Sequence, residues 1–170
     1  SWPGYSVPFE VCSNYIIPKY VDSSTLFIAS SYSGNTEETL SALAEAESKG
    51  ANIAVITSGG KLKEIAEDKD YPLVELPTGF QPRTTACYGL NALITVLDSF
   101  NLVDGKKLKD ELKEVAKFIK NEVSGWTADI PAAKNPAKKL ARELMGLSPV
   151  IYSGPFLWPA GCCRYYVSVL

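Results

Sequence analysis

Two short apolar segments, each followed by a polar turn and a helix-like pattern, constrain most strongly what this chain can fold into. TLFIAS (Thr25–Ser30) and NIAVIT (Asn52–Thr57) are nearly continuous apolar runs, as expected of strands that are buried on both faces. Apolar residues at helical spacing follow each run, over residues 36–49 and 61–70. Because strands that alternate with helices at short spacing form right-handed crossovers, the pattern predicts a doubly wound α/β fold with a parallel sheet.

The character of the chain changes part-way along its length. YPLVEL (Tyr71–Leu76) predicts a third strand, and an apolar helix after it completes a first domain over residues 1–103. A more polar amphipathic helix and a linker follow over residues 104–130. We expect residues 131–170 to begin a second domain, with a strand at Pro149–Tyr152.

The charge balance narrows the classes of function. The chain carries 17 Lys and Arg against 19 Asp and Glu, a net charge of -2, so it lacks the overall positive field that binds nucleic acid or an anionic membrane. It contains no histidine, which excludes a Ser-His-Asp or Cys-His nucleophile and a histidine-ligated metal built from this chain alone. Since no apolar run approaches the roughly 20 residues that span a bilayer, we expect a cytoplasmic protein.

The octet SYSGNTEE connects the first predicted strand to the helix that follows it. This is the carboxyl edge of a parallel sheet, where ligands of open α/β folds bind. Ser31, Ser33 and Thr36 supply hydroxyl groups, and Gly34 permits a tight turn that exposes backbone N–H groups. Together with the positive end of the following helix, these groups predict a phosphate site that needs no lysine.

Helix capping explains part of the same octet. Asn35 followed by Glu38 fits a capping box, and acidic residues in the first turn complement the helix dipole. Capping does not require three hydroxyl groups around a glycine, so phosphate binding is the favoured interpretation.

A second segment, LPTGFQPR (Leu76–Arg83), combines two prolines with a glycine and ends in an arginine. A guanidinium held in such a loop can bind phosphate or stabilise an oxyanion. An arginine in a loop is equally often an ion-pair partner at a surface or an interface, and the residues alone leave both interpretations of Arg83 open.

Several separate motifs resemble those of one family. SYSGNTEETL is similar to the signature of sugar isomerase (SIS) domains, and together with TSGGKL and PTGFQPR it resembles the bifunctional phosphoglucose/phosphomannose isomerases. NPAKKLARELMGLSPVIYSG is similar to the start of their second SIS domain. The resemblance implies a flavodoxin-like, three-layer αβα sandwich over 1–103, the start of a second SIS domain over 131–170, and a homodimer.

The resemblance also implies a reaction and a site. The family interconverts glucose 6-phosphate or mannose 6-phosphate with fructose 6-phosphate through an enediolate, without a metal or an organic cofactor. Arg83 would stabilise the enediolate. The substrate phosphate would be held by the loop residues Ser31, Ser33, Gly34, Asn35 and Thr36.

The match to the family has gaps. Its catalytic glutamate and histidine and its first phosphate-contacting loop are not recognisable in this sequence, so we expect the chain to be incomplete at both ends. Whether the chain is active as given stays open. The alternative is a non-catalytic SIS module that binds or senses a phosphosugar.

Overall fold

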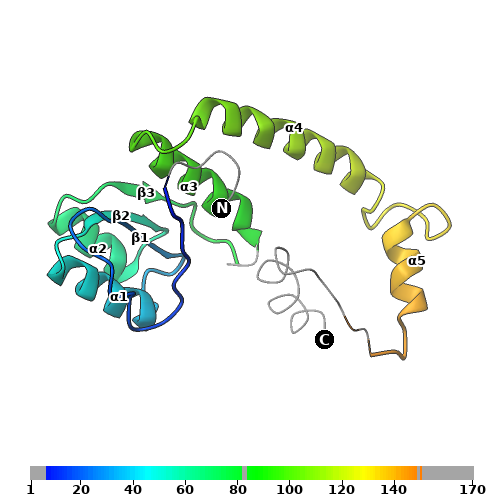
Figure 1. The fold of residues 1–170 in the computed structure, drawn as a ribbon. Helices are drawn as coiled ribbons and strands as arrows, with labels where there is room; N and C mark the ends of the chain where they lie inside the picture. The colour runs from blue at the N-terminus through cyan, green and yellow to red at the C-terminus, as the bar shows by residue number, and fades with distance from the viewer. Residues whose placement is uncertain (1–6, 82–83, 149, 151–170) are drawn as a thin grey trace. The chain divides into compact units, whose positions relative to one another are not determined.

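A parallel sheet carries the first part of the chain, which confirms the α/β fold class. The computed structural model describes residues 7–81, 84–148 and 150. Within them the sheet contains, in spatial order, β1 (Leu26–Ser31), β2 (Asn52–Thr57) and β3 (Leu73–Glu75), as Figure 1 shows. Both pairs are parallel, with Ser31 opposite Thr57 and Thr57 opposite Glu75. The carboxyl ends of the three strands therefore lie together at one edge of the sheet.

Helices connect the strands and continue beyond them. Their bounds are α1 (Glu37–Ser48), α2 (Gly60–Asp68), α3 (Ala86–Ser99), α4 (Gly105–Ser124) and α5 (Pro136–Glu143). The predicted strand over 52–57 coincides with β2, and the predicted strand over 25–30 differs from β1 by one residue at each end. The amphipathic helix expected after residue 103 is α4.

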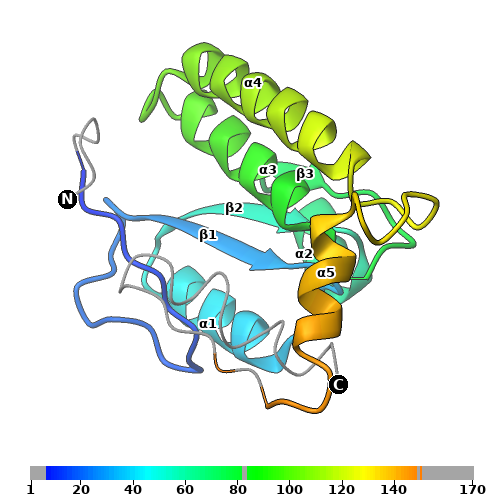
Figure 2. The same ribbon diagram turned by 90° about the vertical axis from the view of Figure 1, so that its right-hand side faces the viewer.

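Successive residues of β2 enter different core clusters, as the strand pattern predicts. One cluster joins the sheet to α1 and α2 and includes Ile53, Val55, Leu43 and Leu62. The other joins the sheet to α3 and includes Ala54, Ile56, Ala92 and Val96. Because side chains alternate between the two faces of a strand, both faces of the sheet are covered. Figure 2 shows α1 and α3 on opposite sides of the sheet, which makes three layers.

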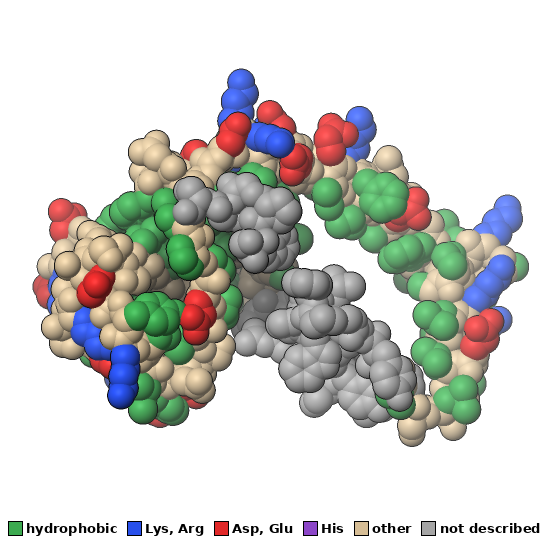
Figure 3. Space-filling model, viewed as in Figure 1, with side chains coloured by type: hydrophobic (Ala, Val, Ile, Leu, Met, Phe, Trp, Pro, Cys, Tyr) green, Lys and Arg blue, Asp and Glu red, His purple; other side chains and the backbone are tan. Residues whose placement is uncertain are grey.

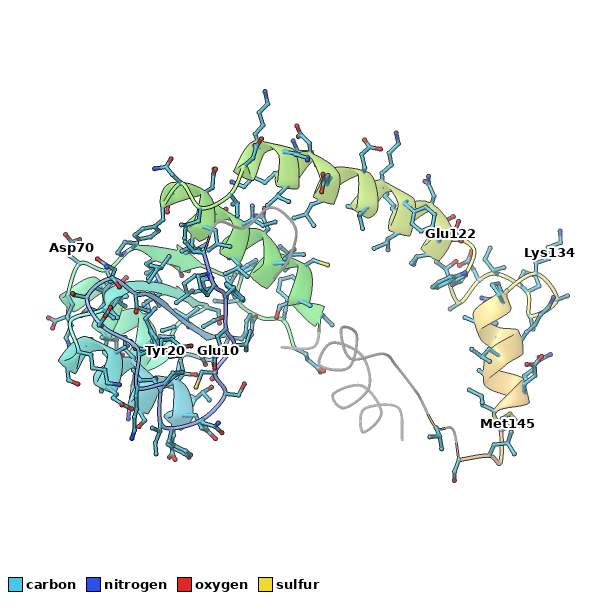
Figure 4. All side chains as sticks on the ribbon, in the orientation of Figure 1. Glu10, Tyr20, Asp70, Glu122, Lys134 and Met145 are labelled. Atoms are coloured by element: carbon cyan, nitrogen blue, oxygen red, sulfur yellow. The ribbon has the colours of Figure 1, made fainter. Side chains whose placement is uncertain are left out.

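The segment before β1 is anchored to α1. Ile17 and Val21 are buried in the cluster that contains α1, and the Ile17 N–H donates a hydrogen bond of 3.1 Å to the Glu45 carboxylate. Tyr20 also donates to Glu10, and Figure 4 shows these two side chains next to each other. The anchored segment covers part of the α1 side of the sheet.

By its contacts the chain divides into two compact units, Ser1–Lys109 and Asp110–Leu170. The domain boundaries expected after residues 103 and 130 stay predictions. The strand expected at Pro149–Tyr152 lies outside the described residues except for Val150, so the second domain is likewise a prediction. Among the described helices, none combines the length and the apolar character that crossing a membrane requires.

The second unit is stabilised locally around one buried side chain. Asn135 is fully buried, caps α5 by accepting the Lys138 N–H at 3.0 Å, and donates to the Thr127 carbonyl at 3.0 Å. Apolar side chains are exposed on two helices, namely Val115, Phe118, Ile119 and Val123 on α4 and Leu140 on α5. Figure 3 shows apolar surface along both helices.

Candidate functional site

The turns after β1 and β2 lie side by side at the carboxyl edge of the sheet. Ser31 ends β1 and pairs in register with Thr57, which ends β2. The Ser58 N–H donates to the Tyr32 carbonyl at 3.0 Å, and the Leu62 N–H donates to the Gly34 carbonyl at 3.0 Å. The predicted phosphate loop is therefore held against the next turn of the sheet.

The three hydroxyl groups of the loop have different surroundings. The Ser31 hydroxyl is 2.7 Å from the Thr36 hydroxyl and accepts the Gly34 N–H at 3.2 Å. The Ser31 residue is only 8% exposed, whereas Ser33 and Thr36 are exposed. Since a hydroxyl has one proton and two lone pairs, Thr36 keeps hydrogen-bonding capacity beyond its bond to Ser31. The Ser33 hydroxyl accepts the Asn35 N–H at 3.3 Å and keeps its proton for a further bond. Ser31 therefore shapes the loop from within, while Ser33 and Thr36 are exposed and retain hydrogen-bonding capacity for a ligand.

Gly34 fits where no other residue can. Its φ is +69°, in the left-handed region, and an added Cβ would stand 1.7 Å from the Gly59 carbonyl oxygen. The second turn has a matching constraint, because a Cβ on Gly60, at φ +69°, would stand 2.4 Å from the Ser33 carbonyl oxygen. Each turn thus needs a glycine so that the other can approach.

Asn35 caps a different helix from the one that its sequence position suggests. Its side-chain oxygen accepts the Lys61 N–H at 3.1 Å, in the first turn of α2. The N-cap of α1 is Thr36, whose hydroxyl bonds to Ser31. The interpretation of Asn35 and Glu38 as a capping box is therefore wrong. The first amides of α1 have no partner within the helix, and they point toward the loop with the positive end of the helix dipole.

The charges near the loop are mostly negative. Glu37 and Glu38 lie in the first turn of α1, and Tyr15 donates to Glu37 at 3.5 Å. The negative charge of Glu38, followed by burial and by Glu37, raises the pKa of Tyr15 above its ordinary value of 10.0. Within the loop itself, the groups that can bind an anion at close range are neutral hydroxyl and amide donors.

Arg83 and its neighbour Pro82 lie outside the described residues, so its predicted role stays a prediction. The preceding residues of the same loop are described. The Tyr32 hydroxyl donates to the Pro77 carbonyl at 2.9 Å and accepts the Phe80 N–H at 3.1 Å. The structure thus brings the two predicted loops together through a residue that sequence reasoning missed. The available signal was a tyrosine directly after a buried strand, between two serines.

Known proteins share this region. The bifunctional phosphoglucose/phosphomannose isomerase of Caldicellulosiruptor bescii is 42% identical over 146 residues, which are 86% of this chain and 42% of that protein. The protein of the same description from Aquifex aeolicus is 36% identical over 151 residues, 89% of this chain and 42% of its own length. The chain belongs to the bifunctional phosphoglucose/phosphomannose isomerase family. The resemblance drawn from the motifs is confirmed.

The family match has a defined extent. The chain spans about two fifths of the length of these curated relatives, 42% in each case. A protein described as D-glucosamine-6-phosphate 4-epimerase, from Sulfolobus acidocaldarius, is 45% identical over 117 residues, 62% of this chain and 38% of that protein. No family model matches the chain, and no solved structure matches it significantly. Relatives named for different reactions therefore share this part of the chain.

Proposed function

We propose that the chain is the phosphosugar-binding part of an isomerase that interconverts glucose 6-phosphate or mannose 6-phosphate with fructose 6-phosphate. The observation that carries the proposal is the exposed pair of hydroxyls, Ser33 and Thr36, at the N-terminus of α1. This pair lies in a chain that is 42% identical over 146 residues to a phosphoglucose/phosphomannose isomerase.

In this proposal the substrate phosphate docks on the loop between β1 and α1. Ser33 and Thr36 donate hydrogen bonds to it, the first amides of α1 supply further donors, and the helix dipole adds a favourable field. Ser31, Gly34 and Asn35 act on the shape of the loop through the bonds described above. Neutral donors suit a site that has Glu37 and Glu38 beside it.

The proposed chemistry is a proton transfer between neighbouring carbons. A base removes the proton next to the carbonyl, an enediolate forms, and a proton returns to the adjacent carbon. A positioned cation lowers the barrier by stabilising the developing oxyanion, and we assign this role to Arg83. The assignment rests on the sequence motif PTGFQPR. The reaction itself requires neither a metal nor an organic cofactor.

The alternative is a module that binds a phosphosugar without turning it over. Two relatives support it, because the names of the isomerase and of the epimerase both refer to a phosphorylated hexose, while their reactions differ. Phosphosugar binding is therefore the property common to both candidate functions.

The family also supports finer structural proposals. We infer that the sheet with its helices is an SIS-type domain and that residues 131–170 begin a second one. A homodimer fits the apolar helix α3, where Tyr88 and Leu90 are exposed. The expected phosphosugar substrate fits a protein of the cytoplasm.

Binding of fructose 6-phosphate tests the common property. Replacing Ser33 or Thr36 by alanine should weaken the affinity measured by calorimetry by roughly ten- to a hundredfold, because each variant removes a hydrogen bond to a charged group worth roughly 1.5–3 kcal/mol. Ser48→Ala is the matched control, since its hydroxyl bonds to the Glu45 carbonyl at the far end of α1. Unchanged affinity in both loop variants would refute the site.

Turnover separates the two candidate functions. In a chimera, residues of this chain replace the matched region of the Caldicellulosiruptor bescii isomerase, and fructose 6-phosphate formation is measured from both aldose phosphates. The isomerase proposal predicts activity that falls in the Arg83→Ala form. A chimera that folds and binds fructose 6-phosphate without turnover would favour the binding module.

A further inference from the structure

Tyr32 occupies a position where three turns of the sheet edge can be joined. It follows β1 directly, between Ser31 and Ser33, and it is half-buried. Its side chain packs against the core cluster under α3. The ring is therefore held by apolar contacts that do not depend on its hydroxyl group.

The backbone of Tyr32 binds the turn after β2. Its carbonyl oxygen accepts the Ser58 N–H at 3.0 Å and the Ser58 hydroxyl at 2.5 Å. The Thr57 hydroxyl approaches the same oxygen at 3.5 Å. One carbonyl thus fixes the second turn to the first.

The hydroxyl of Tyr32 binds the turn after β3. It donates its proton to the Pro77 carbonyl at 2.9 Å, and its lone pair accepts the Phe80 N–H at 3.1 Å. Between these two contacts Gly79 adopts a φ of +84°. The Phe80 ring also contacts the Tyr88 ring of α3, with ring centroids 5.9 Å apart. A single phenol therefore holds both ends of the short segment Pro77–Phe80.

This placement matters for any ligand larger than a phosphate ion. A phosphate on Ser33 and Thr36 needs only the first loop. The remainder of a phosphosugar extends over the neighbouring turns, because ligands of such folds lie outside the carboxyl ends of the strands. The segment Pro77–Phe80 is one of these turns, and the Tyr32 hydroxyl is hydrogen-bonded to both its ends.

We propose that Tyr32 is a positioning residue that holds the turn after β3 in place for the sugar portion of a phosphosugar bound at the Ser31–Thr36 loop. The proposal rests on the proposed function, since it assumes that the loop binds the phosphate. It makes Tyr32 a determinant of the preference for a phosphosugar over inorganic phosphate, without direct contact to the phosphate.

Calorimetry of the 170-residue chain with fructose 6-phosphate and with inorganic phosphate tests the proposal. Tyr32→Phe keeps the packed ring and removes both hydrogen bonds of the hydroxyl. We expect it to weaken fructose 6-phosphate binding about fivefold, which is the effect of losing one hydrogen bond between the displaced turn and the sugar, and to leave phosphate binding within about twofold. The ratio of the two affinities is the readout that a purely structural role would not move.

Tyr71→Phe is the matched control. Tyr71 donates to Glu47 at 3.0 Å, and its ring packs in the other core cluster, so the same chemical change there should alter neither affinity. Equal weakening of both ligands by Tyr32→Phe, or no change in either, would overturn the role of Tyr32. A wild-type chain that binds neither ligand would overturn the proposed function, and the inference with it. The two failures are therefore distinguishable.

Discussion

The turn after β1 and the turn after β2 occupy equivalent places at neighbouring strand ends, and both combine hydroxyl residues with glycine. In the second turn, the Thr57 hydroxyl donates to the Gly59 carbonyl at 2.9 Å and the Ser58 hydroxyl donates to Tyr32. In the first turn, Ser33 and Thr36 are exposed. The comparison teaches that hydroxyl content does not identify a binding turn. The hydroxyls of both turns have partners in the protein, since Ser33 accepts the Asn35 N–H at 3.3 Å and Thr36 bonds to Ser31 at 2.7 Å. What differs is exposure, because Ser33 and Thr36 are exposed, Thr57 is buried and Ser58 is half-buried.

The contact between the two turns can be broken most severely at Gly34. Gly34→Ala should lower the free energy of unfolding by about 3 kcal/mol, because it adds left-handed strain to an overlap with the Gly59 carbonyl, where the new Cβ would stand at 1.7 Å. Urea denaturation followed by circular dichroism measures the loss.

Gly79→Ala is the control for that strain. Gly79 also has a positive φ, +84°, but an added Cβ would meet nothing within 4 Å. Its cost should be about 1 kcal/mol, from the backbone conformation alone. Equal losses in the two variants would show that the close approach of the turns contributes nothing.

A smaller effect is expected at Asn35, which joins the first turn to α2. Asn35→Ala removes the acceptor of the Lys61 N–H and should cost about 1 kcal/mol of stability, as other lost helix caps do. Asn35→Asp retains an acceptor oxygen and should recover most of the loss in the same denaturation experiment. If aspartate were as harmful as alanine, the cross-turn cap would not be the reason.

The smallest expected effect is a dependence of stability on pH. It should arise from the charged contact of Glu45 in the same unit and be absent from the neutral contacts between the turns. The Ile17 N–H, followed by Lys49, lowers the pKa of Glu45 below its ordinary value of 4.5. A lowered pKa means that the contact stabilises the fold above pH 4.5 and is lost as the pH falls through the lower, folded-state value.

Amide chemical shifts followed during acidification measure this difference. The chemical shift of the Ile17 amide should change as Glu45 takes up a proton, and this change should be absent in Glu45→Gln. The chemical shift of the Ser58 amide, which donates to a backbone carbonyl, should stay constant over the same pH range. Parallel changes in the chemical shifts of both amides would mean that acid perturbs the whole unit rather than one contact.

The sequence predicted the sheet well, since strands buried on both faces leave a clear apolar pattern. The run over 52–57 was identified to the residue. The pattern of Asn35 and Glu38 misled because capping rules consider only local partners, whereas the amide that Asn35 binds lies 26 residues away. Nothing in the local pattern around Tyr32 indicates that its hydroxyl accepts an amide 48 residues along the chain.

The sequence by itself determined the fold class, the order of strands and helices, and the presence of a turn rich in hydroxyls at the end of β1. These features follow from short-range periodicity and from residue types. Only the tertiary structure decided that Ser31 is buried, with its hydroxyl bonded inside the loop, while Ser33 and Thr36 are exposed. The physical reason is that hydrogen-bond partners across the sheet edge become neighbours only after the parallel strands have paired.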